Sequence, residues 1–553
     1  MLWLIDSMKF FKKNIFVLLL ILFSILALVD LLHPGFPLTH DGQDHIARIA
    51  NFYTSLKEGN FVPRWAGNLN WGYGHPILMF LYPLPSYIAS VFILLGVSFV
   101  DSFKLVFALS FLASVLAMYY WLREEFGDLP AFTGAVLYGF SPYRFVDLYV
   151  RGAIGEHLAF VFFPLLCLGT LRLSRKDDTR GWVIVALSTG ALILSHNALS
   201  LMFFPLAILY ALYLYWKENL GKKFIVKASS AFAIGFLLSA FFWVPAFFEG
   251  KYTLRDLVTR GVTENRFVEP FQFIYSPWSY GGSDTLSKML GFPQLLAGVF
   301  VLFFLYRSKD KIFKIFSGSL IVLALISLFF MTSTSRFFWE NISVLQKFQF
   351  PWRLLSVTVC VFSVIGATAV AVVEKKKQFF VSMVLVGLTL ISTFPMWRAR
   401  EYLEKKSEFF STTYDSTTDT GESSPIWSIR FMEKRPDRDR VIEIIGGEAT
   451  IQPTIRTSTR HEYDVVAVNT AQLRENTVYF PGWHVFVNGK ETLVEYQDQS
   501  NRGVMTFYVP PGNSHVSVVF TDTKIRQASV FITLIGVLIF LSTVIFRKKI
   551  WKT

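Results

Sequence analysis

Long apolar runs separated by short polar connections dominate this sequence. Twelve of them approach the roughly 20 residues that a helix needs to cross about 30 Å of hydrocarbon while satisfying its own backbone hydrogen bonds. The pattern therefore predicts a polytopic α-helical membrane protein with about 12 spans, at 14–32, 102–122, 129–142, 158–173, 181–196, 199–216, 224–247, 292–306, 313–331, 354–373, 378–395 and 527–546.

Basic residues recur at every second connection between these runs, except at Arg123–Asp128, which is acidic on balance. They lie at Lys9–Lys13, Arg172–Arg180, Lys217–Lys223, Arg307–Lys314, Lys375–Lys377 and Arg547–Lys552. Because Lys and Arg are enriched in cytoplasmic connections, both termini of this multi-pass protein are predicted to lie on the cytoplasmic side of the plasma membrane. No small-residue cleavage site follows the first run, so we interpret it as a retained span.

The run at 77–97 is also apolar enough to cross. A crossing there would move every later basic connection to the outside, against the charge pattern. We therefore predict that this segment is membrane-embedded or interfacial and does not cross. Pro83 and Pro85 within it are typical of a broken element.

The period of the pattern changes to two after residue 395. Alternating residues within 396–524, with turns at Asn488-Gly489 and Pro511-Gly512, predict a small extracytoplasmic antiparallel β-sandwich. The predicted organisation is thus a membrane module at 1–395 with outer loops at 33–101 and 141–157, a β-rich domain at 396–524, and a final span with a basic tail at 525–553.

Composition agrees with the membrane assignment. Charged residues make up 17% of the chain, against about 25% in soluble proteins. A net charge of +13 would suggest nucleic acid in a soluble protein. Here orientation in the membrane explains the excess, and we expect no nucleic-acid partner. Cys167 and Cys360 lie inside apolar runs, which excludes a disulfide framework or a thiol metal site.

The densest polar cluster follows the first span, at Thr39–His45. Helical spacing of the next apolar residues, with Gly59 as a C-cap, predicts an amphipathic helix on the outer membrane surface. Asp41 and Asp44 would serve as a capping pair for this helix. Capping needs only one of them, so the alternative is that a carboxylate here acts as a general base for a hydroxyl group.

Three further polar clusters are predicted on the same side. Each has a plain alternative: a hydrophilic turn for the first, a polar helix end for the second and a lipid headgroup contact for the third. Arg353 breaks the charge pattern and needs an anionic partner such as phosphate or carboxylate. The clusters are Asp147–His157 with Arg144 just before it, His196-Asn197 and Gln349–Arg353.

Aromatic residues concentrate in the same outer loops. Most are expected to be interfacial belt residues, and some are suited to stacking on sugar rings, although the sequence selects none of them. They are Trp65, Trp71, Tyr73, Tyr82, Tyr87, Tyr275, Trp278 and Tyr280.

Six short motifs carry a resemblance to known proteins: HDGQDH at 40–45, WGYGHP at 71–76, RGAIGEH at 151–157, SHN at 195–197, FQFPWR at 348–353 and YFPGWHVFVNGK at 479–490. In order and sidedness they resemble membrane glycosyltransferases of the GT-C fold. More narrowly, the chain is similar to the "6-pyruvoyl-tetrahydropterin synthase-related" membrane proteins and to YfhO-like proteins. No histidine cluster has zinc-site spacing, so we expect no pterin chemistry.

The resemblance implies a transferase that moves a sugar from a polyprenyl-phosphate donor to a glycan, lipid or protein acceptor of the cell envelope. Asp41 would be the catalytic base, with Asp44 as its competitor, and Glu156 matches the acidic position of the second loop. That loop lacks an acidic pair separated by one residue. The departure makes a divalent metal cofactor doubtful, and we assign no metal ligand.

The remaining polar residues are candidates for substrate binding. Arg151 and Arg353 would hold the donor phosphate. Membrane lipids are expected partners in any case. Two other functions remain open, a transporter or flippase for lipid-linked sugars and a non-catalytic scaffold in envelope assembly. The other candidate binding residues are His40, His45, His157, His196, Asn197 and Trp352.

Overall fold

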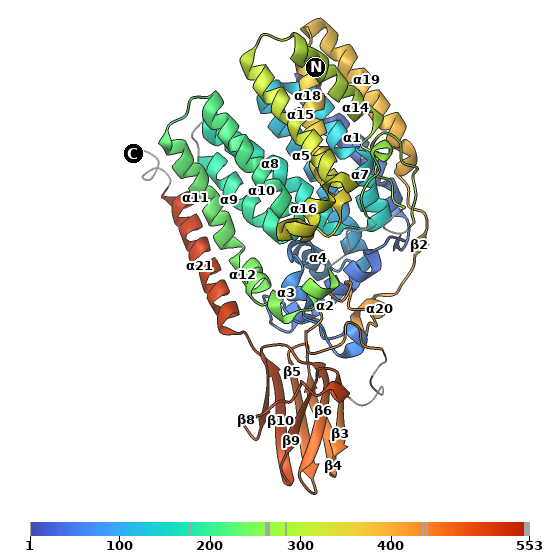
Figure 1. Cartoon of the computed structure of the whole chain (residues 1–553), viewed down its shortest axis with the longest axis vertical. Helices are drawn as coiled ribbons and strands as arrows, with labels where there is room; N and C mark the ends of the chain where they lie inside the picture. Colours follow the sequence, from blue (N-terminus) through green and yellow to red (C-terminus); the bar gives the residue numbers. More distant parts are fainter. Residues whose placement is uncertain are drawn as a thin grey trace.

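The computed structural model describes residues 2–175, 179–259, 266–281, 285–433, 436 and 441–546, with side chains from residue 14 onward. Within them, long helices form one body and a β-sandwich projects from one end of it (Figure 1). The predicted basic tail at 547–552 lies outside the described residues.

Eight helices in the described part of the chain are long and apolar enough to cross a membrane. A ninth crossing would come from α11 (Lys222–Leu238) and α12 (Ala240–Phe248), which are bent by 71° at Ser239. The eight include α1 (Leu2–Leu28), α5 (Phe99–Phe126), α8 (Ile154–Arg175), α10 (Asn197–Lys217), α15 (Lys311–Met331), α18 (Leu355–Ala371), α19 (Lys375–Thr393) and α21 (Lys524–Ile545).

Three of the expected spans form shorter helices. These are α6 (Asp128–Gly139), α9 (Thr179–Ser195) and α14 (Phe292–Arg307). The polytopic helical character is therefore confirmed, while a total of about 12 crossings stays a prediction. The helices α8 and α18 are largely buried at the centre, whereas α15 and α21 expose most of their apolar surface. Such exposed apolar surface is suited to contact with lipid.

The segment at 77–97 is short and broken. It forms α3 (Ile77–Phe80) and α4 (Leu84–Leu94) with a break between them. At 1.5 Å per residue the 11 residues of α4 reach only about 16 Å, about half of the hydrocarbon thickness. This length is short for a crossing, and the place of the segment relative to the membrane stays a prediction.

The helix α2 (Gly42–Lys57) differs from the expected surface helix. It begins and ends near the predicted positions, and Gly59 has the left-handed φ of +91° expected after its end. However, polar as well as apolar residues of α2 are buried, Arg48 and Asn51 among them. The cause is that α4, α5 and α20 (Ser407–Ser411) all pack against it.

The C-terminal domain is the predicted antiparallel β-sandwich. One sheet has the order β4-β5-β10-β7-β8 and the other β3-β6-β9. Asn488 and Gly489 both have positive φ, as a two-residue type I′ turn requires. The strands are β3 (Ile442–Gly446), β4 (Ala449–Arg456), β5 (Arg460–Ala467), β6 (Ala471–Val478), β7 (Trp483–Val487), β8 (Lys490–Thr492), β9 (Val504–Val509) and β10 (Gly512–Phe520).

Residues of the first outer loop complete the sandwich core. Trp65, Tyr73 and Phe80 belong to the same buried cluster as the strands. The Trp65 ring lies 5.4 Å from that of Trp483 in an edge-to-face arrangement. Trp65 and Tyr73 are therefore packing residues here rather than members of an exposed belt at the lipid interface.

Residues 399–433, the returning segment, run back over the outer loops before the sandwich begins. In this segment β2 (Tyr402–Leu403) pairs with β1 (Phe36–Pro37), next to the first span. The start of α1 and the end of α21 lie at the end of the molecule opposite the sandwich (Figure 1). Short helical turns complete the described fold: α7 (Pro142–Phe145), α13 (Arg255–Val258), α16 (Arg336–Asn341) and α17 (Ser343–Gln346).

Candidate functional site

The first and second outer loops are joined through their main chains. The N–H of His40 donates to the carbonyl of Val150 at 3.0 Å, and the N–H of Asp41 donates to that of Arg151 at 2.9 Å. A π-helical turn, η3 (Val146–Arg151), precedes Gly152, which has a left-handed φ of +68°. π-Helical turns are frequent at functional sites. The two loops that carry the predicted acidic residues therefore lie together.

Asp41 precedes α2 but does not cap it. The side-chain oxygen of Thr39 accepts the Gly42 N–H at 3.1 Å instead. Within the described part of the chain, Asp41 makes no side-chain capping bond, and it is half-buried. The prediction that Asp41 and Asp44 form a capping pair is therefore wrong for Asp41. A half-buried carboxylate that is not used for capping is suited to accept a proton from a hydroxyl group.

Asp44 has a specific partner that the sequence did not reveal. The Tyr414 hydroxyl donates to Asp44 Oδ1 at 2.8 Å and accepts from Gln43 Nε2 at 2.9 Å. Burial raises the pKa of Asp44 above its usual value, although Arg48 and the Tyr414 hydrogen bond act in the opposite direction. Asp44 is therefore a better base than an exposed aspartate, but one of its oxygens is already occupied.

Glu156 is the centre of a buried ionic cluster. Arg151 Nη2 and Arg353 Nε donate to Glu156 Oε1 at 2.8 and 2.7 Å, and the Tyr143 hydroxyl donates to Oε2 at 2.9 Å. Arg151 Nη1 also contacts Asp147 Oδ1 at 2.6 Å. Side chains of the second loop and of the motif at 348–353, almost 200 residues apart in sequence, thus form one unit. We call these five residues the Glu156 cluster.

The charge of the Glu156 cluster depends on Asp147. Burial, together with the nearby Glu156 carboxylate, raises the pKa of Asp147, against the opposing effect of Arg151 and Arg144. With both carboxylates ionised the two arginines are balanced. With Asp147 neutral, the cluster carries one positive charge in excess.

Two further predicted residues belong to this neighbourhood. His196 Nε2 lies 3.8 Å from Glu156 Oε1, while its Nδ1 accepts the Leu199 N–H at the start of α10. Trp352 is buried, and the Arg151 guanidinium carbon lies 4.8 Å from its ring centroid. In the structure Trp352 therefore supports Arg151 by cation–π contact.

The side chains of the other predicted binding residues have other partners than Glu156. His157 contacts Arg144 at 3.4 Å, and Asn197 donates to the Phe80 carbonyl at 3.0 Å. His45 is buried beside the Phe103 ring. His40 is exposed and bonds the Gly281 carbonyl at 2.7 Å.

Tyr82 shows that the predicted charges share one environment. Burial raises the pKa of its phenol to about 12, and the charges of Glu156, Asp41 and Arg353 all act on it. Tyr82 also packs on the His196 ring, with centroids 4.9 Å apart. The charges of the first-loop, second-loop and 348–353 motifs therefore all act on one buried side chain.

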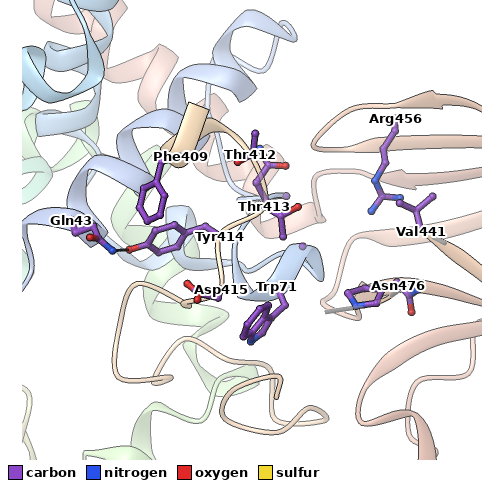
Figure 2. Close-up of a pocket in the computed structure, with 14 residues that line it drawn as sticks. Gln43, Trp71, Phe409, Thr412, Thr413, Tyr414, Asp415, Val441, Arg456 and Asn476 are labelled. Carbon is purple, nitrogen blue, oxygen red and sulfur yellow. Dashed lines mark hydrogen bonds between the residues drawn. The ribbon is translucent and has the colours of Figure 1, made fainter. Parts of the chain in front are cut away.

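A pocket of about 580 Å³ opens next to this region (Figure 2). Gln43 and Tyr414 belong to its lining, whereas Asp41, Glu156 and Arg353 do not. The sequence reasoning missed Tyr143, Tyr414 and Glu422, which accepts from Gln349 at 2.7 Å. Tyr414 directly precedes, and Glu422 lies within, a run rich in Ser, Thr, Asp and Gly at 415–424, a composition typical of a loop.

Metal binding was left doubtful by the sequence. In the part of the chain that the structure describes, no group of three or more His, Cys, Asp or Glu side chains is placed to hold a metal ion.

Comparison with known proteins identifies a family for the larger part of the chain. Residues 78–400 match the family described as 6-pyruvoyl-tetrahydropterin synthase related domain, membrane protein. An uncharacterised protein of Lactococcus lactis subsp. cremoris (strain MG1363) is 27% identical over 343 residues, which cover 58% of this chain and 55% of that protein. The chain thus spans about half the length of this curated relative.

Three solved structures are similar at low identity. Arabinofuranosyltransferase AftD from Mycobacteria gives a TM-score of 0.45 at 14% identity, over 72% of this chain and 28% of AftD. ArnT from Cupriavidus metallidurans, bound to undecaprenyl phosphate, gives a TM-score of 0.36 at 13% identity, over 72% of this chain and 68% of ArnT. The Archaeoglobus fulgidus oligosaccharyltransferase gives a TM-score of 0.37 at 15% identity, over 72% of this chain and 53% of that protein. No TM-score here reaches 0.5, and we base no conclusion on these likenesses.

Proposed function

The chain belongs to the 6-pyruvoyl-tetrahydropterin synthase-related family of membrane proteins, and we propose that this member is a glycosyltransferase of the GT-C type. It moves a sugar from a polyprenyl-phosphate donor to a hydroxyl group of an envelope glycan, lipid or protein. The reaction takes place on the outer face of the membrane, where the β-sandwich also lies.

The observation that carries this proposal is the main-chain pairing of the two outer loops. It holds the backbone of Asp41 next to that of Arg151, whose side chain belongs to the Glu156 cluster. A carboxylate for the acceptor proton and arginines for a leaving phosphate are the two groups that such a transfer needs. The motif resemblance identified from the sequence points to the same chemistry.

In the proposed step the acceptor oxygen attacks the anomeric carbon of the donor sugar. A carbon–oxygen bond forms there as the bond to the phosphate oxygen breaks, and the electron pair leaves with the polyprenyl phosphate. Asp41 takes the proton of the acceptor hydroxyl, with Asp44 as the competing base. Direct attack inverts the anomeric centre.

The Glu156 cluster is proposed to receive the phosphate. Glu156 holds Arg151 and Arg353 on one carboxylate oxygen, which fixes the distance between the two guanidinium groups. The raised pKa of Asp147 favours its protonation, which would leave the cluster with one positive charge in excess. Positioned cations that need no rearrangement stabilise the developing charge of the leaving group.

Mass spectrometry of lipid-linked glycans and envelope polymers tests the proposal. Cells would carry the natural protein, Asp41→Asn, Asp256→Asn or no protein. Asp256 is an exposed aspartate of α13 and is the matched control. Loss of a general base lowers the rate by about 100-fold to 10,000-fold. We expect one glycan species to be depleted in the deletion strain and with Asp41→Asn, and restored with Asp256→Asn.

Two results would contradict this expectation. A deletion that changes no glycan would remove the transferase function. The other result is that the glycan disappears in the deletion strain and returns fully in strains that carry Asp41→Asn alone and Asp44→Asn alone. That result would indicate a non-catalytic scaffold.

A further inference from the structure

The pocket beside the first-loop motif has walls from three separate parts of the chain. Gln43 and Trp71 come from the first outer loop, Phe409–Asp415 from the returning segment, and Arg456 from the β-sandwich (Figure 2). Its volume of about 580 Å³ falls in the range of small-molecule binding sites, about 300–1,000 Å³. The pocket therefore exists only because the sandwich is docked on the loops.

The walls combine aromatic faces with hydrogen-bonding groups, of which Asp415 and Arg456 are charged. Trp71, Phe409 and Tyr414 supply rings, while Gln43 and Thr413 supply an amide and a hydroxyl. A sugar ring presents an apolar C–H face together with a rim of hydroxyl groups. Aromatic rings match that face, and amides and hydroxyls both donate to and accept from that rim.

Arg456 is a fixed donor on the sandwich wall. Its Nη1 contacts Glu475 Oε1 and the Tyr463 hydroxyl, each at 3.1 Å. Glu475 is fully buried and also bonds His461 at 3.0 Å. Against the effect of burial, His461 and Arg456 lower the pKa of Glu475 to about 2. The carboxylate stays ionised, so Arg456 keeps its orientation before any ligand arrives.

The pocket borders the segment that carries the candidate bases. Gln43 lies between Gly42 and Asp44 in the first-loop motif, and its amide bonds the Tyr414 hydroxyl, which in turn bonds Asp44. A molecule in the pocket would therefore contact the segment that carries Asp41 and Asp44.

We propose that this pocket binds a saccharide and that the saccharide is the acceptor of the transfer. The second part rests on the proposed function. The sandwich then has a definite role, because it closes the acceptor site and supplies Arg456. The acceptor class is narrowed from a glycan, lipid or protein to a molecule that carries a sugar chain.

Binding of the full-length protein to an array of immobilised oligosaccharides tests the pocket. The protein would be held in lipid nanodiscs, because detergents with sugar headgroups would compete. The array would present neutral hexose, deoxyhexose and N-acetylhexosamine oligosaccharides. We expect binding to at least one class. Loss of a charged hydrogen bond, worth about 1.5–3 kcal/mol, should weaken it about tenfold to 100-fold in Arg456→Ala.

Two further variants make the test specific. Thr413→Trp replaces an exposed lining residue and fills the pocket without touching the Glu475 network, so it should abolish binding even if Arg456→Ala folds poorly. Arg460→Ala removes an arginine that instead pairs with Glu462 and should bind normally.

The outcomes separate this proposal from the proposed function. An array that retains no protein, or binding that both Arg456→Ala and Thr413→Trp leave unchanged, would overturn the saccharide site. Asp41→Asn should bind as tightly as the natural protein while losing transfer. If binding depends on the pocket but neither Asp41→Asn nor Asp44→Asn changes the cellular glycans, the saccharide site stands and the transferase function fails.

Discussion

Glu156 illustrates how single residues organise this protein. Its carboxylate is fully buried and accepts from Arg151, Arg353 and Tyr143. Buried charges are tolerated only when they are paired and hydrogen-bonded. Glu156 is therefore best understood as the residue that positions the two arginines, rather than as the group that takes the acceptor proton.

Removing either Glu156 or Arg353 should lower the stability of the protein strongly, and removing both should lower it by less than the sum of the two losses. Breaking a buried ion pair costs about 3–5 kcal/mol because the remaining charge is left unpaired. We expect Glu156→Gln and Arg353→Met each to lower the Tm of the purified protein, and the double variant to lower it by less than the sum. The exposed pair Glu374–Lys377 is the control and should give no measurable change. Additive losses for Glu156 and Arg353 would refute the coupling.

Asp44 should make stability depend on pH in a defined direction. Its pKa in the folded protein lies above the usual value of 3.8, chiefly through burial. The folded state then binds more protons than the unfolded state, so the contribution of Asp44 to stability falls as pH rises through the folded pKa. Asp44→Asn mimics the protonated form. Its Tm relative to the natural protein should be higher at about pH 7 than at about pH 4. A difference that shrinks with rising pH would contradict the assignment.

At the scale of elements, the turn after η3 joins the two outer loops. Gly152 has a left-handed φ, and a Cβ there would collide with Thr39 Oγ1 and come within 3.0 Å of the Gly42 nitrogen. A side chain at position 152 would therefore have two costs, the strain of a left-handed backbone and a steric clash with the first-loop motif. The pairing that places Asp41 beside Arg151 depends on this glycine.

Gly152→Ala and Gly59→Ala separate these two effects. Gly59 also has a left-handed φ, but a Cβ there meets nothing within 4 Å. Gly59→Ala should cost only the strain, about 1–2 kcal/mol, and leave glycan transfer intact. Gly152→Ala should lower the Tm further and reduce transfer. Equal losses of Tm with transfer intact in both variants would show that the loop contact is unimportant.

The elements that the sequence predicted best are those with strong periodic signals. The long apolar helices, the two-residue turn at Asn488-Gly489 and the sandwich all follow from local pattern. The environment of α2 was missed, because amphipathic spacing cannot tell that the returning segment covers the polar side of a helix. Tyr414 was missed for the same reason, since a partner about 370 residues from Asp44 leaves no local signal.

At the scale of the whole molecule, the returning segment links the two bodies of the fold. It pairs with the first outer loop at β1 and β2, contacts Asp44 through Tyr414, and meets Gln349 through Glu422. The family and the membrane class were predicted from short motifs and composition, and the match at residues 78–400 confirms both. The pocket could not be predicted, because its walls lie far apart in the sequence.

The proposed transfer requires the outer loops and the sandwich to face the outside while the basic connections face the cytoplasm. Labelling of single cysteines in intact cells with a membrane-impermeant maleimide tests this most directly, because the two native cysteines are buried. Lys57→Cys at the end of α2 and Leu493→Cys in the sandwich should react, and Lys376→Cys, in the basic first turn of α19, should react only after permeabilisation. Protection of Lys57→Cys in intact cells, or reaction of Lys376→Cys, would contradict the proposed orientation.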